Sequence, residues 1–309
     1  MTTDPIWFTP QPRSTRVPEA PTEPARERFA LEVDGRAVEA ERGQTLLEVL
    51  RGEGIDVPTL CYLETLAPVN ACRVCMVELE GARTLVPACS RKAEPGMKIR
   101  SESERVRLAR KVVYELLASS VDLSTAPGLA ERLAQYGCRP ERFGGEAAAA
   151  SVEQPVKVDN DLYVRDYGKC VLCYKCVEAC GVDAQNTFAI AIAGRGFDAH
   201  VSTERDVPLP TSACVYCGNC IAVCPTGALM AKPEFDLREA GEWAPERQTE
   251  IDTICGYCGV GCTLTVHVQD ERIVKMTSPL DNSVTHGNLC VKGRFGFEFV
   301  QLGRGRPDD

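Results

Sequence analysis

The chain has 309 residues, long enough for two or more domains, and 17 cysteines, which would suggest disulfides only in a secreted protein. Its formal net charge is −9, and no stretch is basic enough to bind nucleic acid. Residues 1–28 lack the apolar core of an export signal, and the apolar run at 188–193 is too short for membrane insertion. These features favour a cytoplasmic protein that keeps its thiols reduced for metal and works with protein partners.

The N-terminal part divides into a tail and a first domain. Residues 1–27 are rich in proline and polar side chains, and we expect a disordered tail. The chain then alternates as a strand at 29–33, turns at residues 34–35 and begins a return strand at 37–38. Helical spacing at 45–50 predicts a short helix. We predict that this first domain extends over residues 28–101.

Four cysteines of the first domain have a spacing typical of a metal site. They are Cys61, Cys72, Cys75 and Cys89. Two lie close together on a predicted loop, and the outer two come from flanking segments. This spacing predicts a planar 2Fe–2S cluster rather than a cube. Zinc is the alternative that any four cysteines leave open.

Residues 102–154 are predicted to form a helical connector. Apolar residues recur at helical spacing between Glu102 and Ser119, including Val106, Val113 and Leu116, which predicts an amphipathic helix. Residues 147–150 are interpreted as a linker or short helix. Cys138 is predicted to be a buried or free thiol rather than a ligand.

The next stretch, 155–240, contains the pattern Cys-x2-Cys-x2-Cys-x3-Cys twice. In such a run three thiolates face one iron–sulfur cube, and the fourth cysteine points to a second cube. The first predicted 4Fe–4S set is therefore Cys170, Cys173, Cys176 and Cys224. The second is Cys180, Cys214, Cys217 and Cys220. Zinc sites use cysteine pairs with a longer spacer, so the spacing favours iron.

Residues 241–309 carry a third set of this size. Its members are Cys255, Cys258, Cys262 and Cys290, predicted to hold a further 4Fe–4S cluster. Alternation at 263–268 and 273–276 predicts a hairpin beside them. The histidines of the chain are His200, His267 and His286. None is needed as a ligand, because every set already has four cysteines; His286, in the loop before Cys290, is the one expected near a cofactor.

The stretch 70–78 resembles a known domain. It is similar to the 2Fe–2S domain at the N-terminus of the large iron–sulfur subunit of respiratory complex I, which NAD-linked formate dehydrogenases and hydrogenases also carry. The resemblance implies a β-grasp fold. In these families a further cluster, bound by one histidine and three cysteines, follows the connecting helix. Since no histidine lies between Ser90 and Lys169, we expect that cluster to be absent here.

The stretches 255–262 and 288–296 resemble the N-terminal cluster domain of molybdopterin-dependent formate dehydrogenases. In that family the lysine just after the fourth cysteine lies between cluster and pterin, a place that Lys292 has here. A solvated surface lysine is the alternative. The resemblance covers about 28–101 and 155–300. It implies an α+β chain with a β-grasp 2Fe–2S ferredoxin domain, a double 4Fe–4S ferredoxin domain and a small β-hairpin 4Fe–4S domain of the molybdopterin oxidoreductase type.

The resemblance also implies a function for the whole chain. The family's catalytic body cannot fit in residues 297–309, so we expect it on a separate polypeptide and no catalytic residue in this chain. Electrons from formate would leave a Mo/W-bis-pterin guanine dinucleotide on one partner and reach FMN and NAD on another. The 2Fe–2S cluster would be a terminal or branch station. The alternatives are an electron-transfer subunit of an NAD-linked hydrogenase or of a complex I-like NADH dehydrogenase, and a non-catalytic metal scaffold or redox sensor.

Overall fold

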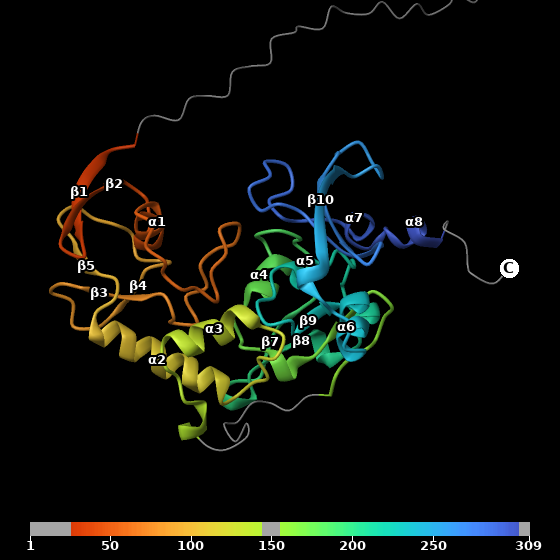
Figure 1. Cartoon of the computed structure of the whole chain (residues 1–309), viewed down its shortest axis with the longest axis horizontal. Coiled ribbons are helices and arrows are strands. Elements are labelled where there is room, and N and C mark those ends of the chain that lie inside the picture. Colours follow the sequence, from red (N-terminus) through yellow and green to blue (C-terminus); the bar gives the residue numbers. More distant parts are fainter. Residues whose placement is uncertain (1–25, 144–154, 303–309) are drawn as a thin grey trace, which may run out of the picture.

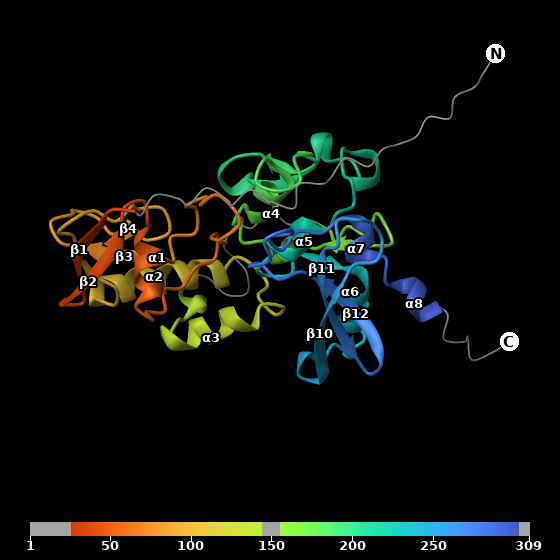
Figure 2. The same ribbon diagram turned by 90° about the horizontal axis from the view of Figure 1, so that it is seen from above.

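The computed structural model describes residues 26–143 and 155–302, which form three bodies in sequence order (Figure 1). The N-terminal sheet lies at one end, the cysteine-rich central body and the three-stranded C-terminal sheet lie beside each other in the other half, and the last helix extends away from them. Seen from above, the N-terminal sheet is again at one end, and the central body and the C-terminal sheet lie next to each other (Figure 2). The α+β class predicted from the sequence is confirmed. Residues 1–25 of the tail expected at 1–27, and the linker at 147–150, lie outside the described residues.

The N-terminal sheet has five strands in the order β2-β1-β5-β3-β4. They are β1 (Arg28–Val33), β2 (Arg36–Glu41), β3 (Met76–Leu79), β4 (Val86–Pro87) and β5 (Lys98–Arg100). β1 pairs antiparallel with β2, as the predicted hairpin requires, and parallel with β5. Helix α1 (Leu46–Gly52) buries Leu46, Leu47 and Leu50 in the same apolar core. A capping box between Thr45 and Glu48 fixes where α1 begins. A mixed sheet covered by one helix is the β-grasp arrangement.

The described part of the connector, up to residue 143, contains three helical segments. They are α2 (Glu104–Ala118), α3 (Pro127–Gln135) and the 3-10 turn η1 (Pro140–Phe143). The predicted amphipathic helix is confirmed as α2, but its buried face contains charges: Arg110 and Glu115 are fully buried, whereas Leu116 is 44% exposed. Arg110 donates to the Met76 carbonyl at 2.9 Å, and Glu115 accepts from the Arg139 amide at 2.9 Å. These partners stabilise charges that burial alone would exclude.

The central body combines short strands with short helices. Its strands are β6 (Tyr163–Arg165), β7 (Ala191–Ala193), β8 (His200–Ser202) and β9 (Leu229–Ala231), its helices are α4 (Lys175–Cys180), α5 (Asn219–Ala222) and α6 (Lys232–Glu239), and its 3-10 turns are η2 (Tyr167–Lys169), η3 (Gly196–Asp198), η4 (Glu204–Asp206) and η5 (Leu209–Thr211). β6 pairs antiparallel with β9, and β7 with β8. Each cysteine run continues into a helix, α4 or α5, and these two helices pack against each other.

The C-terminal body is a sheet of three antiparallel strands. They are β10 (Gln248–Ile254), β11 (Thr263–Gln269) and β12 (Arg272–Thr277), with the 3-10 turn η6 (Pro245–Arg247) before them and the helices α7 (Val291–Phe295) and α8 (Glu298–Leu302) after them. The predicted hairpin is confirmed as β11–β12. Its turn residues Asp270 and Glu271 both have positive φ, as a type I′ turn requires. β10 was not predicted, because its side chains are mostly polar and exposed. No helix in the described ranges is long and apolar enough to span a membrane.

The fully buried Leu47 of α1 tests the core of the first domain. Leu47→Ala should lower the free energy of unfolding by about 2–5 kcal/mol, because a cavity replaces well-packed side-chain atoms. Leu108→Ala is the matched control: Leu108 is 59% exposed on α2, so its loss should cost below about 0.5 kcal/mol. Anaerobic urea unfolding followed by circular dichroism measures both. Equal losses in the two variants would contradict this packing.

Candidate metal centres

Thiols from two distant segments line one pocket of the central body. They are Cys170, Cys173, Cys176 and Cys224. The pocket measures about 330 Å³ out to its open mouth, and Tyr167, Val201 and Leu229 contribute to its walls. The structure therefore brings together the four residues that the spacing groups as the first 4Fe–4S set. Their role as ligands stays a prediction.

A second pocket lies beside the first. It is lined by Cys180, Cys214, Cys217 and Cys220, the second set grouped from the spacing. It measures about 420 Å³, and Tyr163, Arg165 and Leu209 line it as well. Leu229 contributes to both pockets, which are therefore neighbours with a shared wall. The Tyr163 hydroxyl lies 2.9 Å from the Cys214 sulfur.

Backbone amides point at several of these sulfur atoms. The bonds run from Leu172 N–H to Cys170 Sγ (3.4 Å), from Tyr216 N–H to Cys214 Sγ (3.4 Å) and from Ala189 N–H to Cys180 Sγ (3.2 Å). Two of the donors, Leu172 and Tyr216, occupy equivalent positions of the two runs and both have positive φ, at 50° and 57°. Such a backbone is unfavourable for a non-glycine residue and clusters at functional sites. Here it turns an amide toward sulfur, which stabilises negative charge on a ligand.

Burial favours the protonated form of several central thiols when no cation is near. It raises the pKa of Cys170 to about 11 and that of Cys173 to about 12, and it places the pKa of Cys176 and Cys220 well above the ordinary range. A thiol must lose its proton to bind metal, and a bound cation drives that loss. The eight central thiols thus fit iron–sulfur clusters, whose iron would supply the compensating charge.

The thiols of the first domain fall into two adjacent pairs. Cys61 pairs with Cys72, whose amide donates to the Cys61 sulfur at 3.4 Å, and Cys75 pairs with Cys89. A hydrogen bond from the partner thiol lowers the pKa of Cys61 to about 5 and that of Cys75 to about 7, whereas the pKa of each partner is raised. Two pairs of thiols fit a core of two irons with two thiolates on each.

The third set lies at the surface of the C-terminal body. Burial, followed by the nearby thiols of Cys255, Cys258 and Cys290, raises the pKa of Cys262, so all four lie near one another. Cys258 and Cys290 are exposed, unlike any of the eight central cysteines. Lys292 follows on α7 and is exposed as well. This candidate centre therefore opens outward.

The remaining candidates have ordinary surroundings. His200 Nδ1 lies 2.7 Å from the Asp198 carbonyl, and His267 Nε2 lies 2.8 Å from the Thr277 hydroxyl, both within strands. His286 is exposed and has positive φ, four residues before Cys290. The Cys138 thiol lies 3.7 Å from the Lys111 carbonyl in the connector.

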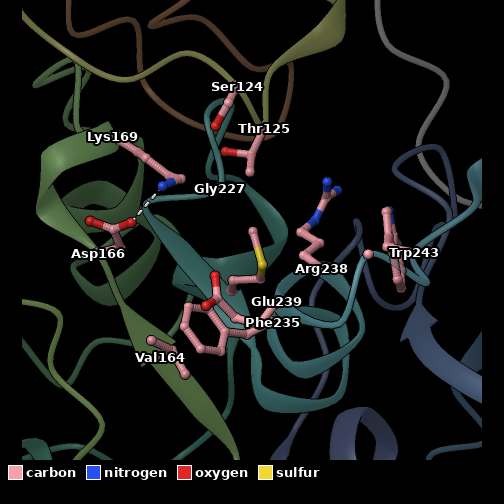
Figure 3. Close-up of a pocket in the computed structure, with 12 residues that line it drawn as sticks. Ser124, Thr125, Val164, Asp166, Lys169, Gly227, Phe235, Arg238, Glu239 and Trp243 are labelled. Carbon is pink, nitrogen blue, oxygen red and sulfur yellow. Dashed lines mark hydrogen bonds and ion pairs between the residues drawn. The ribbon is translucent and has the colours of Figure 1, made fainter.

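One further pocket adjoins the central body without any cysteine (Figure 3). It measures about 810 Å³ out to open solvent and is lined by Lys169, Arg238 and Trp243 among others. Its cations already have partners: Lys169 pairs with Asp166 at 2.6 Å, and Arg238 pairs with Glu234 at 2.8 Å. No sequence pattern pointed to this pocket, and its paired charges indicate no specific ligand.

Three family models match the chain in the order of its three bodies. The model of the 2Fe-2S iron-sulfur cluster binding domain matches residues 26–104, that of the 4Fe-4S dicluster domain matches 169–228, and that of the molybdopterin oxidoreductase Fe4S4 domain matches 248–302. The chain is an iron–sulfur protein. The models support 2Fe–2S and 4Fe–4S clusters and leave the connector unmatched.

The iron–sulfur protein is similar to parts of longer proteins. It is 33% identical to the NADPH-Fe(3+) oxidoreductase subunit alpha of Geobacter sulfurreducens over 88% of this chain, and 30% identical to an NADH-quinone oxidoreductase subunit of Rhizobium meliloti over 87%. It is 27% identical over 89% to the Staphylococcus haemolyticus protein named Putative formate dehydrogenase SH0748. In each case the chain spans 31% of the relative's length.

A solved structure shares the fold. The NAD+-reducing NiFe-hydrogenase in its H2-reduced state matches with a TM-score of 0.57 and 24% identity. The match covers 66% of this chain and 87% of the hydrogenase chain. At this identity the likeness shows the arrangement of the domains and no more.

The crossed grouping of cysteines can be tested by single substitutions. Cys173→Ala and Cys224→Ala should abolish the same electron paramagnetic resonance (EPR) signal and each remove about four irons, since both line one pocket. Cys217→Ala and Cys180→Ala should abolish a different signal. Cys138→Ala, outside every set, is the control and should keep all signals. If Cys173→Ala and Cys180→Ala instead removed the same signal, the crossed grouping would be wrong.

Proposed function

We propose that the iron–sulfur protein relays electrons between a molybdopterin partner that oxidises formate or reduces carbon dioxide and a flavin partner that uses NAD. The match of residues 248–302 to the molybdopterin oxidoreductase Fe4S4 domain carries this proposal. In it, the four thiol sets hold one 2Fe–2S and three 4Fe–4S clusters, which supply one-electron redox chemistry when bound. The chain contributes thiolates, amides and a protein wall; the substrate reacts on the partner.

Contacts between the bodies support an order for the proposed relay. Cys72 and Val74 of the first domain share one apolar cluster with Val171, the neighbour of Cys170. This shared cluster supports a place for the first 4Fe–4S pocket on the side of the 2Fe–2S site. A second contact joins the same bodies: the Ala67 amide donates to Asp183 at 2.6 Å, beside Leu66 packed on Ala179.

The other end of the relay lies at α7. Phe295 stacks on Tyr163 with ring centroids 6.0 Å apart, and Arg294 donates to the Cys217 carbonyl at 3.0 Å. These contacts join the second 4Fe–4S pocket to the set that contains Cys290. The supported order is therefore 2Fe–2S, first central cluster, second central cluster, and the cluster of the C-terminal body. In this order the 2Fe–2S cluster is the last cluster of the relay, on the side of the flavin partner.

Exposed apolar side chains support a partner at the C-terminal body. Tyr257 and Val260 flank the exposed Cys258, and Val291 follows the exposed Cys290. Phe299 on α8 is 63% exposed. Apolar side chains gathered on one face mark an interaction surface. We propose that the molybdopterin partner covers this face and meets Lys292 there.

Two other electron-transfer functions have support of their own. One relative, 35% identical over 65% of this chain, is named as an NADP-reducing hydrogenase subunit, and another is named as an NADH-quinone oxidoreductase subunit. The metal content of the native assembly separates the three functions. Nickel would accompany a hydrogenase partner, and molybdenum or tungsten a formate partner. Neither metal is expected beside a quinone-reducing assembly.

The proposal predicts the composition and activity of the native complex. When the protein is isolated anaerobically from its source, it should carry molybdenum or tungsten and flavin with it, and the complex should reduce NAD+ with formate. Elemental analysis and NADH absorbance measure this. Nickel together with hydrogen-dependent NAD+ reduction, or quinone reduction without either metal, would replace the formate proposal.

The proposed role of Lys292 is testable in that complex. Lys292→Ala should slow the reduction of the clusters by formate about 10–100-fold, the equivalent of one charge-assisted hydrogen bond of about 1.5–3 kcal/mol. Reduction by dithionite should stay unchanged, because it does not pass through the pterin. Lys232→Ala is the control, since Lys232 sits on α6 and pairs with Asp236 at 2.6 Å. Equal formate rates in both variants would assign Lys292 to the solvated surface.

A further inference from the structure

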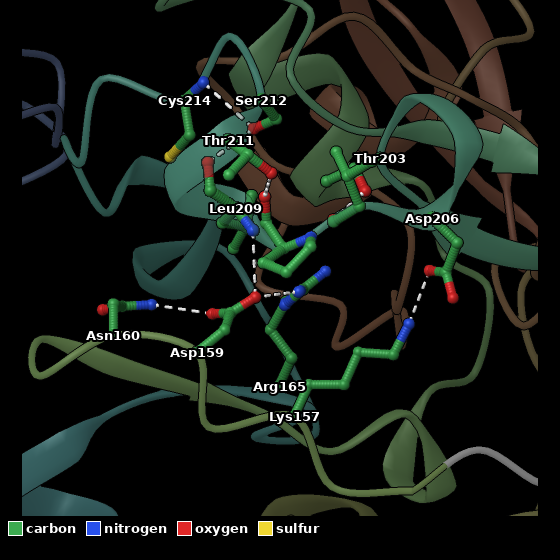
Figure 4. Close-up of polar contacts among 12 residues, drawn as sticks. Lys157, Asp159, Asn160, Arg165, Thr203, Asp206, Leu209, Thr211, Ser212 and Cys214 are labelled. Carbon is green, nitrogen blue, oxygen red and sulfur yellow. Dashed lines mark hydrogen bonds and ion pairs between the residues drawn. The ribbon is translucent and has the colours of Figure 1, made fainter.

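Arg165 is a buried cation with unused hydrogen-bond donors. It lies at the end of β6 with 1% of its surface exposed, and it pairs with Asp159 through Nη2 (Figure 4). Asp159 also accepts from the Leu209 amide at 2.9 Å. Within the described residues, Arg165 Nε and Nη1 form no hydrogen bond of good geometry, and the Tyr167 hydroxyl, which lies close to this guanidinium, also lacks such a bond. A buried donor without a hydrogen-bond acceptor costs free energy, so we expect an acceptor to lie next to these donors in the functional protein.

The surroundings of Arg165 indicate which acceptor this is. Its side chain lines the pocket of Cys180, Cys214, Cys217 and Cys220. Cluster sulfur is anionic and accepts hydrogen bonds, so it is a suitable partner for the free donors. The Tyr163 hydroxyl already lies 2.9 Å from Cys214 Sγ in the same pocket. The two side chains come from one strand, β6.

Arg294 approaches the same cysteine loop from the C-terminal body. It is 4% exposed, and its donors reach neutral acceptors only: the Cys217 carbonyl at 3.0 Å, Asn219 Oδ1 at 3.2 Å and the Met276 carbonyl at 3.3 Å. No carboxylate forms an ion pair with it in the part of the chain that the structure describes. The nearby thiols are those of Cys217, Cys220 and Cys290.

A glycine permits this approach. Gly218 has positive φ, and a Cβ at this position would collide with the Arg294 side chain. The equivalent residue of the first run is Tyr174, which has the same backbone conformation. The two runs differ at this position, and only the second admits a guanidinium against its loop.

The first central pocket has one buried cation nearby, Lys175, and no arginine. Its lining contains no arginine or lysine. Lys175 lies near the Cys173 thiol from outside this lining, and Lys169 is occupied by Asp122 at 2.7 Å and by Asp166 at 2.6 Å. The second pocket therefore has an arginine in its wall and another on its loop, whereas the first has a single lysine, near Cys173.

We propose that Arg165 and Arg294 raise the reduction potential of the cluster in the second pocket, so that this cluster is the first of the two central clusters to accept an electron. Accepting one electron converts one ferric equivalent to ferrous and adds one negative charge, which buried cations and N–H donors stabilise. The proposal rests on the ligand sets of the proposed function. In the relay, the cluster nearest the C-terminal body would hold an electron ready for onward transfer.

The test is a reductive titration of the full chain, purified anaerobically with its clusters and followed by EPR. The signal lost in Cys217→Ala identifies the second-pocket cluster. In the unsubstituted protein this signal should appear at a higher potential than the signal lost in Cys173→Ala. Arg165→Gln and Arg294→Gln should each make it harder to reduce, with at least a tenfold change in the ratio of reduced to oxidised cluster at fixed potential, which is 59 mV for one electron.

Conservative and remote variants separate charge from packing. Arg294→Lys and Arg165→Lys retain the charge and should restore most of the potential. Arg238→Gln, which breaks a pair with Glu234 away from the clusters, should leave every potential unchanged.

If one glutamine variant fails to bind iron, two measurements still test the proposal. These are the potential in the other glutamine variant and the order in which the two central signals appear in the unsubstituted protein. A second-pocket signal that titrates below the first, or that stays fixed in the glutamine variants, overturns the proposal. The reductant is dithionite, so failure of the formate function would leave this result intact.

Discussion

The central body depends on each cysteine run giving its last thiol to the other run's pocket. Cys180 ends α4 yet faces the second pocket, and Cys224 follows α5 yet faces the first. Neither pocket is complete within one segment, so the two helices must pack together before either site exists. A cluster bound in this way holds both segments in place, and its assembly is coupled to folding, as for other metal sites whose ligands are far apart in sequence.

The sequence was most informative about the cysteines, because binding one cluster requires particular intervals between its ligands. The intervals between cysteines grouped the same residues that the structure gathers around each central pocket, because a tight loop allows few arrangements of three thiols. The hairpins β1–β2 and β11–β12 were predicted from alternation and turn residues. β10 was not predicted, because its side chains are mostly polar and exposed and so show no alternation of apolar and polar residues.

The charged interior could not be predicted from patterns. Arg110 and Glu115 on α2, like Arg165 and Arg294 at the second pocket, occupy positions that burial rules assign to apolar residues. Each is tolerated through a partner outside its own helix or strand: a carbonyl on β3, an amide after α3, a carboxylate before β6, or a carbonyl in a cysteine loop. Such partners become visible only once the chain is folded.

The connection of Cys72 and Val171 through one apolar cluster, reinforced by the bond from Ala67 to Asp183, has a kinetic consequence. Many redox modules exchange electrons only during brief encounters, which viscosity slows and salt weakens. Here the first domain is already seated against its neighbour. Electron transfer between the two domains would therefore need no diffusional encounter. Its rate would depend on the driving force and on the protein that separates the two clusters.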